Sequence, residues 1–360
     1  MKEDNIAFLS LVRFGIGHTA SIPTRADWKF MDTLASNHGL LAVMIDGIER
    51  LPEQMRPPKA LLLEWIGNTL QSYEQRYNLY EKAIAKLAAF YNHHGYKMML
   101  LKGYTCSLDW PKPVHRPCGD IDIWQFGQWK EADEALTASL KFHDPSFKID
   151  SSHHHHTVFN WMGFSVENHY DFVNVYAHKS SRKLEKVFKD LGQDDSHFVE
   201  VCGEKVFLPS PNLHALFLIR HMVSHFAAAE ISLRQVLDWA FFVEKHGKEV
   251  DWDWLIGVLK EYHMIDFFNL INAICEKDLG FSAEIFPSVQ YLPSIKERVL
   301  NDILDPEYGT AEPDRLIKRI IYKYRRWHGN AWKQKICYGE SRWSSFWSGI
   351  WAKLLKPASI

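Results

Sequence analysis

MMLLKGYTCSLDWPKPVHRPCGDIDIW, residues 98–124, is the stretch around which the chain is organised. An apolar run ends at Lys102-Gly103, and a second apolar segment follows a glycine further along. Short apolar runs bounded by glycine and other turn residues are typical of buried strands. The sequence therefore predicts one strand over residues 97–101 and another over 119–124.

Two aspartates stand in the second of these strands. Because successive strand side chains point to opposite faces, Asp120 and Asp122 are expected on one face, with Ile121 and Ile123 in the core. Two like charges on one face repel, and a divalent cation between them removes that cost. An exposed strand edge with solvated carboxylates is the alternative. The apolar context favours a metal site.

The Lys-Gly turn supplies groups that suit a phosphate. Glycine lets the backbone come close to a ligand, and Lys102 or the backbone N–H groups beyond Gly103 are suited to face phosphate oxygens. Together with the aspartates, the turn predicts a metal-nucleotide site.

The run LLKGYTCSLDWPKPVHRPCGDIDIW resembles the signature of the uncharacterised nucleotidyltransferase family, within the DNA polymerase β-like superfamily. The shared features are a Lys-Gly turn, a proline-bearing loop, an arginine and a Gly-Asp-hydrophobic-Asp strand. The matching positions are Lys102, Gly103, Arg116, Gly119, Asp120 and Asp122. The usual superfamily turn is Gly-Ser, which Lys-Gly replaces here. The resemblance implies Mg²⁺-dependent chemistry on a nucleotide.

The segment GFSVENHYDFVNV, residues 163–175, is expected to bring a third carboxylate. Alternation places Glu167, His169 and Asp171 on one side of a strand. Glu167 can join the two aspartates if the strands are neighbours. The resembled family has an acidic residue followed two positions later by histidine, which Glu167 and His169 match. Glu167 is thus the predicted third metal carboxylate, and Asp171 is the alternative.

Four consecutive histidines precede this segment, at residues 153–156. In an extended run alternate rings point in opposite directions, so at most two bind one ion. The family pattern has a histidine ahead of the acidic strand. We therefore expect His156 to contact substrate or phosphate, with the other three in a solvated loop.

The resemblance continues through RHMVSHFAAAEISLRQVLDWA, residues 220–240, which reads as helical. His221 and His225 share one helix face, as do Arg234 and Asp238 on the next helix. No glutamate follows the first histidine, so the pair is not the zincin motif. The resemblance implies that these side chains line a substrate cleft; a buried hydrogen-bond network is the alternative.

Periodicity divides the chain into three regions. Apolar residues at helical spacing in 6–16, 31–51 and 60–91 predict an N-terminal helical region, residues 1–95. A mixed pattern follows over 96–205, and helical spacing returns over 206–360. The expected fold class is α+β, with a small mixed-sheet nucleotidyltransferase core flanked by helical regions. Aromatic residues at helical spacing in 341–355 predict a packing or oligomer stripe, or a membrane-surface helix.

Composition excludes several classes of protein. The 360 residues carry a formal charge of −2 and a pI near 6.8, so there is no strong nucleic-acid signature. Five cysteines are widely spaced and never form Cys-x-x-Cys, which indicates reduced thiols in a cytoplasm. The apolar runs are too short to span a bilayer.

The predicted activity is transfer of a nucleoside monophosphate from an NTP, ATP by default, to a hydroxyl-bearing acceptor, with release of pyrophosphate. Asp120, Asp122 and Glu167 would hold two Mg²⁺ ions, or Mn²⁺, while Lys102 and Arg116 neutralise phosphate charge. A small molecule, a protein and an RNA remain open as acceptor. One alternative is a nucleotide-binding regulatory or toxin-system protein without turnover. Another is a metallohydrolase built from residues 153–156 with His221 and His225.

Overall fold

The structure is a computed structural model that describes residues 2–22, 26–142, 144–175, 180–287, 290–308 and 313–339. The chain forms two compact units, each assembled from separate stretches of sequence. The described part of the first lies within Met1–Gln75, Asp109–Pro117 and Ile219–Ser341, and that of the second within Arg76–Leu108 and Cys118–Leu218. The predicted division into three consecutive regions stays a prediction.

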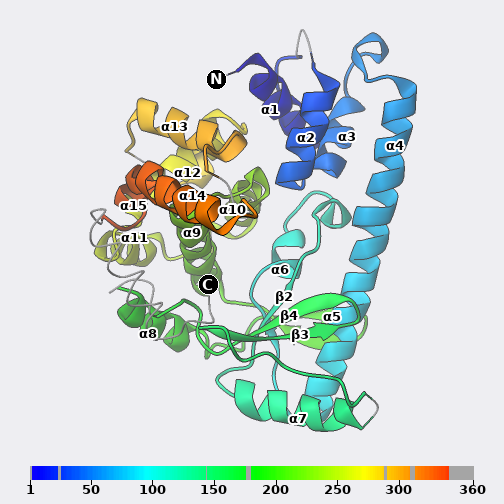
Figure 1. Cartoon of the computed structure of the whole chain (residues 1–360), viewed down its shortest axis with the longest axis vertical. Coiled ribbons are helices and arrows are strands. Elements are labelled where there is room, and N and C mark those ends of the chain that lie inside the picture. The colour runs from blue at the N-terminus through cyan, green and yellow to red at the C-terminus, as the bar shows by residue number, and fades with distance from the viewer. Residues whose placement is uncertain are drawn as a thin grey trace. The chain divides into compact units, whose positions relative to one another are not determined.

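The first unit is helical wherever regular structure is described (Figure 1). The predicted helical segment 31–51 forms two helices, because Gly39 adopts a left-handed conformation with φ of 64° after the first of them. Apolar residues at helical spacing account for the remainder. The helices wholly within this unit are α1 (Glu3–Gly15), α2 (Trp28–His38), α3 (Leu41–Ile48), α4 (Lys59–Thr69), α10 (Leu233–His246), α11 (Trp252–Glu261), α12 (Ile265–Lys277), α13 (Pro293–Leu304), α14 (Leu316–Gly329) and α15 (Ala331–Tyr338).

Two helical stretches pass from one unit to the other. A π-helical turn, Leu70–Gln75, follows α4 and leads directly into α5 (Arg76–His93), so helical residues continue from Lys59 to His93. The apolar spacing over residues 60–91 predicts one long helix or two, and the structure has two α-helices joined by the π-helical turn. Helix α9 (Pro211–Ala228) begins in the second unit and ends in the first.

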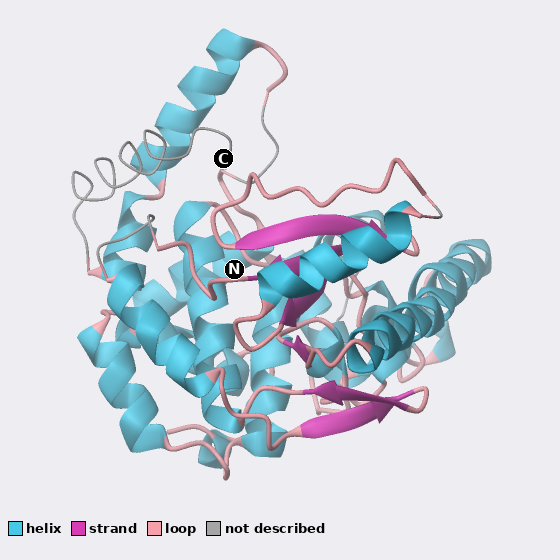
Figure 2. Ribbon diagram, turned by 90° about the horizontal axis from the view of Figure 1, so that it is seen from below, coloured by secondary structure: helices cyan, strands magenta, loops and turns pink. Residues whose placement is uncertain are grey.

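The second unit is built on a six-stranded mixed sheet in the order β3-β4-β2-β1-β6-β5. Its strands are the magenta arrows of Figure 2. Strand β2 runs antiparallel to β1 and parallel to β4, and β1 runs parallel to β6. Two antiparallel hairpins, β3–β4 and β5–β6, form the outer parts. The strands are β1 (Met99–Leu100), β2 (Ile121–Trp124), β3 (His156–Trp161), β4 (Phe164–His169), β5 (Phe198–Val201) and β6 (Glu204–Phe207).

Both hairpins turn through two residues of positive φ, the second a glycine. These are Met162-Gly163 and Cys202-Gly203, with φ of 52° and 85° in the first pair and 48° and 88° in the second. Two-residue turns with positive φ at both positions match the right-handed twist of the flanking strands. They fix the register in which Trp161 faces Phe164 and Val201 faces Glu204.

The two faces of the sheet differ in chemistry. One face carries Ile121, Ile123 and Val166, all fully buried. It packs on α5 and on α7 (Trp129–Lys141), through contacts such as the Tyr80 and Phe164 rings, 5.1 Å apart. The opposite face carries Asp122 and Glu167 on neighbouring strands, and His156 and His169 across the β3–β4 hairpin; these four residues define the ionisable face. Trp124, on the same side of β2 as Asp122, donates to the carbonyl of Gly192, just after α8 (Ser181–Leu191).

The predicted α+β fold class is confirmed by this arrangement of helices and mixed sheet. The apolar residues Phe147 and Ile149 predict a short strand over residues 147–149. This prediction is wrong, since only the neighbouring Asp150 bridges to Val158. The β5–β6 hairpin was not predicted. No helix among the described residues combines the length and apolarity needed to cross a membrane. The predicted aromatic stripe at 341–355 lies outside the described residues.

Candidate active site

A carboxylate pair occupies the ionisable face of the sheet. Asp122 in β2 lies directly opposite Glu167 in β4, because the two parallel strands are neighbours in that register. The condition for Glu167 to join Asp122, that their strands are neighbours, is therefore met. The Asp122 side chain is 1% exposed, whereas that of Glu167 is 22% exposed. Asp122 is therefore the buried member of the pair and Glu167 the accessible one.

Two basic side chains contact the buried carboxylate. Lys102 Nζ lies 3.0 Å from Asp122 Oδ1, and His169 Nε2 lies 3.2 Å from the same oxygen. His169 Nε2 is also 3.7 Å from Glu167 Oε2. The Lys-Gly turn thus delivers its lysine to the carboxylate, and β4 delivers glutamate and histidine on one face.

The charges of this cluster stabilise one another. Burial raises the pKa of the Asp122 carboxyl, but Lys102 and His169 lower it by more, so the net pKa is below its usual range. For His169, burial lowers the pKa, while hydrogen bonds to Asp122 and Glu167 raise it, to about 9. Burial lowers the pKa of Lys102 as well, but Asp122 and Glu167 raise it above its ordinary value. At neutral pH the cluster therefore contains charged Asp122, Lys102 and His169.

The donor set fits a divalent cation. Among the described residues, ligand atoms of Asp122, Glu167 and His169 lie within 4.8 Å of one another. Carboxylate oxygens suit Mg²⁺ and Mn²⁺, and an imidazole also suits later transition metals. Lys102 already supplies one positive charge at the same place.

The other two predicted carboxylates lie outside this group. Asp120 precedes β2 and is exposed, and its backbone carbonyl accepts a 2.7 Å hydrogen bond from the Tyr80 hydroxyl. Asp171 forms an ion pair with Lys189. The assignment of Asp120 as a metal ligand stays a prediction.

Gly103 and Gly119 occupy different kinds of position. Gly103 has φ of 73°, and a Cβ there would lie 2.7 Å from the Tyr80 hydroxyl oxygen. Packing and backbone conformation therefore require glycine at this turn, whether or not a ligand binds. A Cβ at Gly119 would meet no atom within 4 Å. Open space beside Gly119 is compatible with the predicted nucleotide-binding role.

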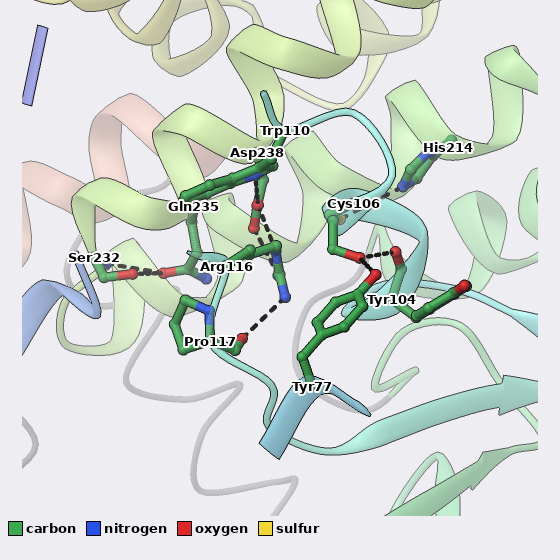
Figure 3. A network of polar contacts seen from close by, with 11 residues as sticks. Tyr77, Tyr104, Cys106, Trp110, Arg116, Pro117, His214, Ser232, Gln235 and Asp238 are labelled. Atoms are coloured by element: carbon green, nitrogen blue, oxygen red, sulfur yellow. Dashed lines mark hydrogen bonds and ion pairs between the residues drawn. The ribbon is translucent and has the colours of Figure 1, made fainter. Parts of the chain in front are cut away.

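The Lys-Gly turn is held by hydroxyl groups that sequence reasoning missed. Tyr77 Oη lies 2.9 Å from Ser107 Oγ in α6 (Tyr104–Ser107) (Figure 3). Thr105 Oγ1 donates to the Leu100 carbonyl at 2.9 Å. Tyr77 and Tyr80 fit the apolar stripe of their helix. Because a buried tyrosine hydroxyl usually has a hydrogen-bond partner, the two tyrosines on this stripe indicate polar partners nearby, although not which ones.

The histidine tract differs from its prediction. Residues 153–155 form a bend rather than an extended run, and only His156 belongs to a strand. His154 and His156 are buried, 3% and 7% exposed, so the expectation of a solvated loop around His156 is wrong for His154. Burial lowers the pKa of His156 to about 4, so this ring is neutral at neutral pH. Its Nδ1 lies 3.9 Å from Glu167 Oε2.

The remaining predicted residues lie in the first unit. Arg116 donates from Nε and Nη2 to the two carboxylate oxygens of Asp238, at 2.7 and 2.9 Å, and Trp110 donates to the same group at 2.8 Å (Figure 3). This buried network matches the structural alternative for Asp238. The nucleotide-binding role of Arg116 stays a prediction.

Three further cleft candidates lie on helices of the same unit. The rings of His221 and His225 are 4.4 Å apart in α9, as their spacing predicts. Arg234 lies at the start of α10. Their predicted contact with substrate stays a prediction, as does a hydrolase site combining His221 and His225 with residues 153–156.

The chain is similar in sequence to a family of known proteins. A family model described as an uncharacterised nucleotidyltransferase matches residues 24–280, more than half of the chain. A similar solved structure is an antigenic nucleotidyltransferase-like protein from Paracoccidioides brasiliensis, at 15% sequence identity and a TM-score of 0.32. The match covers 46% of this chain and 75% of that one. No curated protein matches the chain.

Proposed function

Because the chain belongs to the uncharacterised nucleotidyltransferase family, we propose that it transfers a nucleoside monophosphate from an NTP to a hydroxyl-bearing acceptor. The acceptor oxygen forms a bond to the α-phosphorus, and the bond to pyrophosphate breaks. The observation that carries the proposal is the pairing of Asp122 with Glu167 on adjacent parallel strands, beside Lys102.

Each residue of the cluster has a role that follows from its exposure and charge. Asp122 and Glu167 would hold Mg²⁺, which neutralises phosphate charge when it is bound. Glu167, the more exposed carboxylate, would take the proton of the acceptor hydroxyl. Lys102 is 23% exposed, so its ammonium is able to reach the negative charge of the triphosphate. A second ion, with Asp120 as a ligand, belongs to the proposal as well.

The test is a nucleotide screen by thermal shift, with ATP, CTP, GTP and UTP, each with and without Mg²⁺. Binding at a hundred times Kd stabilises the native state by about 2.7 kcal/mol, which a melting curve detects. Asp122→Asn should abolish the Mg²⁺-dependent shift. Asp171→Asn is the matched control, because Asp171 pairs with Lys189 outside the carboxylate group. Absence of a shift with every nucleotide, or its full retention in Asp122→Asn, would contradict the proposal.

One observation favours a second candidate, nucleotide binding without turnover. Lys102 and His169 already neutralise Asp122 at 3.0 and 3.2 Å, which lessens the need for a metal at that carboxylate. A regulatory protein would then bind nucleotide through Lys102 without Mg²⁺. Pyrophosphate release in the presence of candidate acceptors separates the two: binding with no release against any acceptor supports the regulatory candidate.

A further inference from the structure

Three imidazole rings gather beside the carboxylate pair in the second unit. His155 directly precedes β3, His156 begins it, and His169 ends β4 opposite His156 in the hairpin register. One ring nitrogen from each lies within 4.8 Å of those of the other two. The β3–β4 hairpin thus supplies all three from a segment of fifteen residues, counting 155 to 169 inclusive.

Two of these rings have nitrogen atoms with no hydrogen bond. Nδ1 of His155 and Nδ1 of His156 are buried and make none. Buried polar atoms nearly always have a partner, because taking them out of water without one is costly. Coordination of a metal would satisfy such nitrogens.

The third ring is oriented as a metal ligand usually is. His169 Nδ1 lies 3.3 Å from the backbone carbonyl oxygen of Asp171. A metal-ligating histidine commonly donates its other N–H to a carbonyl or carboxylate, which fixes the ring and leaves the ligating nitrogen available. In His169 this leaves Nε2, which contacts Asp122 Oδ1 at 3.2 Å in the metal-free protein, so metal binding at Nε2 would displace its proton.

A carboxylate stands near the same atoms. Glu167 Oε2 is 3.7 Å from His169 Nε2 and 3.9 Å from His156 Nδ1. In a tetrahedral zinc site with bonds of about 2.0–2.1 Å, neighbouring ligand atoms are roughly 3.3–3.4 Å apart. The two distances from Glu167 Oε2 are therefore a few tenths of an ångström longer than in a closed site, and the three ring nitrogens, within 4.8 Å of one another, would move up to about 1.5 Å closer together on binding.

We propose that His155, His156 and His169 bind a divalent transition metal of the zinc class, with Glu167 adjacent. Imidazole nitrogen suits zinc and its neighbours, whereas Mg²⁺ prefers oxygen. This site is distinct from the Mg²⁺ chemistry proposed above, although it shares Glu167 and His169 with that cluster. It is defined by metal binding alone, whatever the fate of nucleotide transfer.

The test uses the full chain without an affinity tag, because a polyhistidine tag would itself bind the metal. After treatment with a chelator, the protein is titrated with Co²⁺, the visible absorption of tetrahedral cobalt is followed, and Zn²⁺ is used in competition. The variants are His155→Asn and His156→Asn. The matched control is His153→Asn, in the same tract; His153 lies 3.6 Å from Asp150 and belongs to no metal group among the described residues.

The wild type and the control should bind one ion per chain with the tetrahedral spectrum. Loss of a group that only orients a ligand lowers metal affinity by roughly 10–100-fold. The two variants each lose a ligand, so their affinity for Co²⁺ should fall by more than this. Far-UV circular dichroism checks that each variant is folded, and His155→Gln and His156→Gln replace any that is not. Absence of stoichiometric metal in the wild type would overturn the proposal. Equal affinity in all variants, or equal loss in the control, would do so as well.

The two proposals fail separately. If the wild type binds no cobalt but shows Mg²⁺-dependent nucleotide binding, only the histidine metal site is refuted. If the wild type binds cobalt as expected but no nucleotide, only nucleotidyl transfer is refuted.

Discussion

Asp238→Asn tests the buried ion pair of the first unit. Asp238 is 4% and Arg116 6% exposed, and the carboxylate accepts from Arg116 Nε, Arg116 Nη2 and Trp110 Nε1. The amide that replaces it has one oxygen and one NH₂ group. One guanidinium N–H would then face a donor instead of an acceptor, and the charge of Arg116 would remain buried without its counter-ion.

The expected cost follows from this burial. Breaking a buried ion pair by removal of one partner costs about 3–5 kcal/mol, because an uncompensated charge stays in the interior. With a urea m-value of about 3 kcal/mol/M, the midpoint of unfolding should fall by about 1 M or more. Asp305→Asn is the control, since Asp305 pairs with Lys2 at the surface, where both side chains are more than half exposed. Its midpoint should not move, because exposed pairs contribute little.

Urea unfolding followed by far-UV circular dichroism measures both midpoints. A shift in Asp238→Asn as small as that of the control would refute the reasoning. In that case the ion pair between Arg116 and Asp238 contributes little to the free energy of unfolding. Arg116 could then exchange Asp238 for a phosphate, as its predicted nucleotide-binding role requires.

Other changes in the second unit have equally definite outcomes. Gly103→Ala should lower the free energy of unfolding by at least about 2 kcal/mol, because Gly103 has a positive φ and a Cβ there would meet the Tyr80 hydroxyl. Gly119→Ala should change the free energy of unfolding by no more than about 0.5 kcal/mol. Equal urea midpoints for the two variants would contradict this. Burial raises the pKa of Glu185 to about 8, so the folded protein holds a proton that the unfolded chain releases above its ordinary value of 4.5. Stability should therefore fall as pH rises from about 5 to 8, and Glu185→Gln should flatten that slope in urea midpoints at several pH values; an unchanged slope would exclude Glu185 as its source.

The sequence was sufficient for the centre of the site. Alternation within β2 and β4 correctly placed Ile121 and Ile123 in the core, and Asp122 and Glu167 on the other face. This succeeded because both strands are regular and one face of each is buried, so the side-chain period of two is enforced by packing.

The same reasoning did not reach positions outside the strands. Asp120 is one residue before β2, where the ladder that enforces alternation has not begun, and its carbonyl is held by Tyr80. The histidine tract bends, so a rule for extended chain did not apply to His154 and His155. Partners distant in sequence, such as Asp238 for Arg116, leave no local periodic signal.

The β5–β6 hairpin has only a weak signal in the sequence. The segment FVEVCGEKVF, residues 198–207, alternates about a Cys-Gly pair. Asn-Gly, Asp-Gly and Gly-Gly are the recognised two-residue hairpin turns, and Cys-Gly shares only the glycine with them. The Met162-Gly163 turn between β3 and β4 is of the same kind, with positive φ at both residues and glycine second.

The tight Met162-Gly163 turn makes chain length within the β3–β4 hairpin as important as residue identity. Insertion or deletion of a single residue in β4 between the turn and Glu167 would turn the rest of that strand over. Glu167 and His169 would then point toward α7, and Asn168 would enter the ionisable face in their place. Substitutions in this hairpin change one contact at a time, whereas one codon gained or lost there would remove glutamate and histidine together. Single-residue insertions in β4 therefore test, independently of substitutions, whether activity needs Glu167 and His169 on the ionisable face.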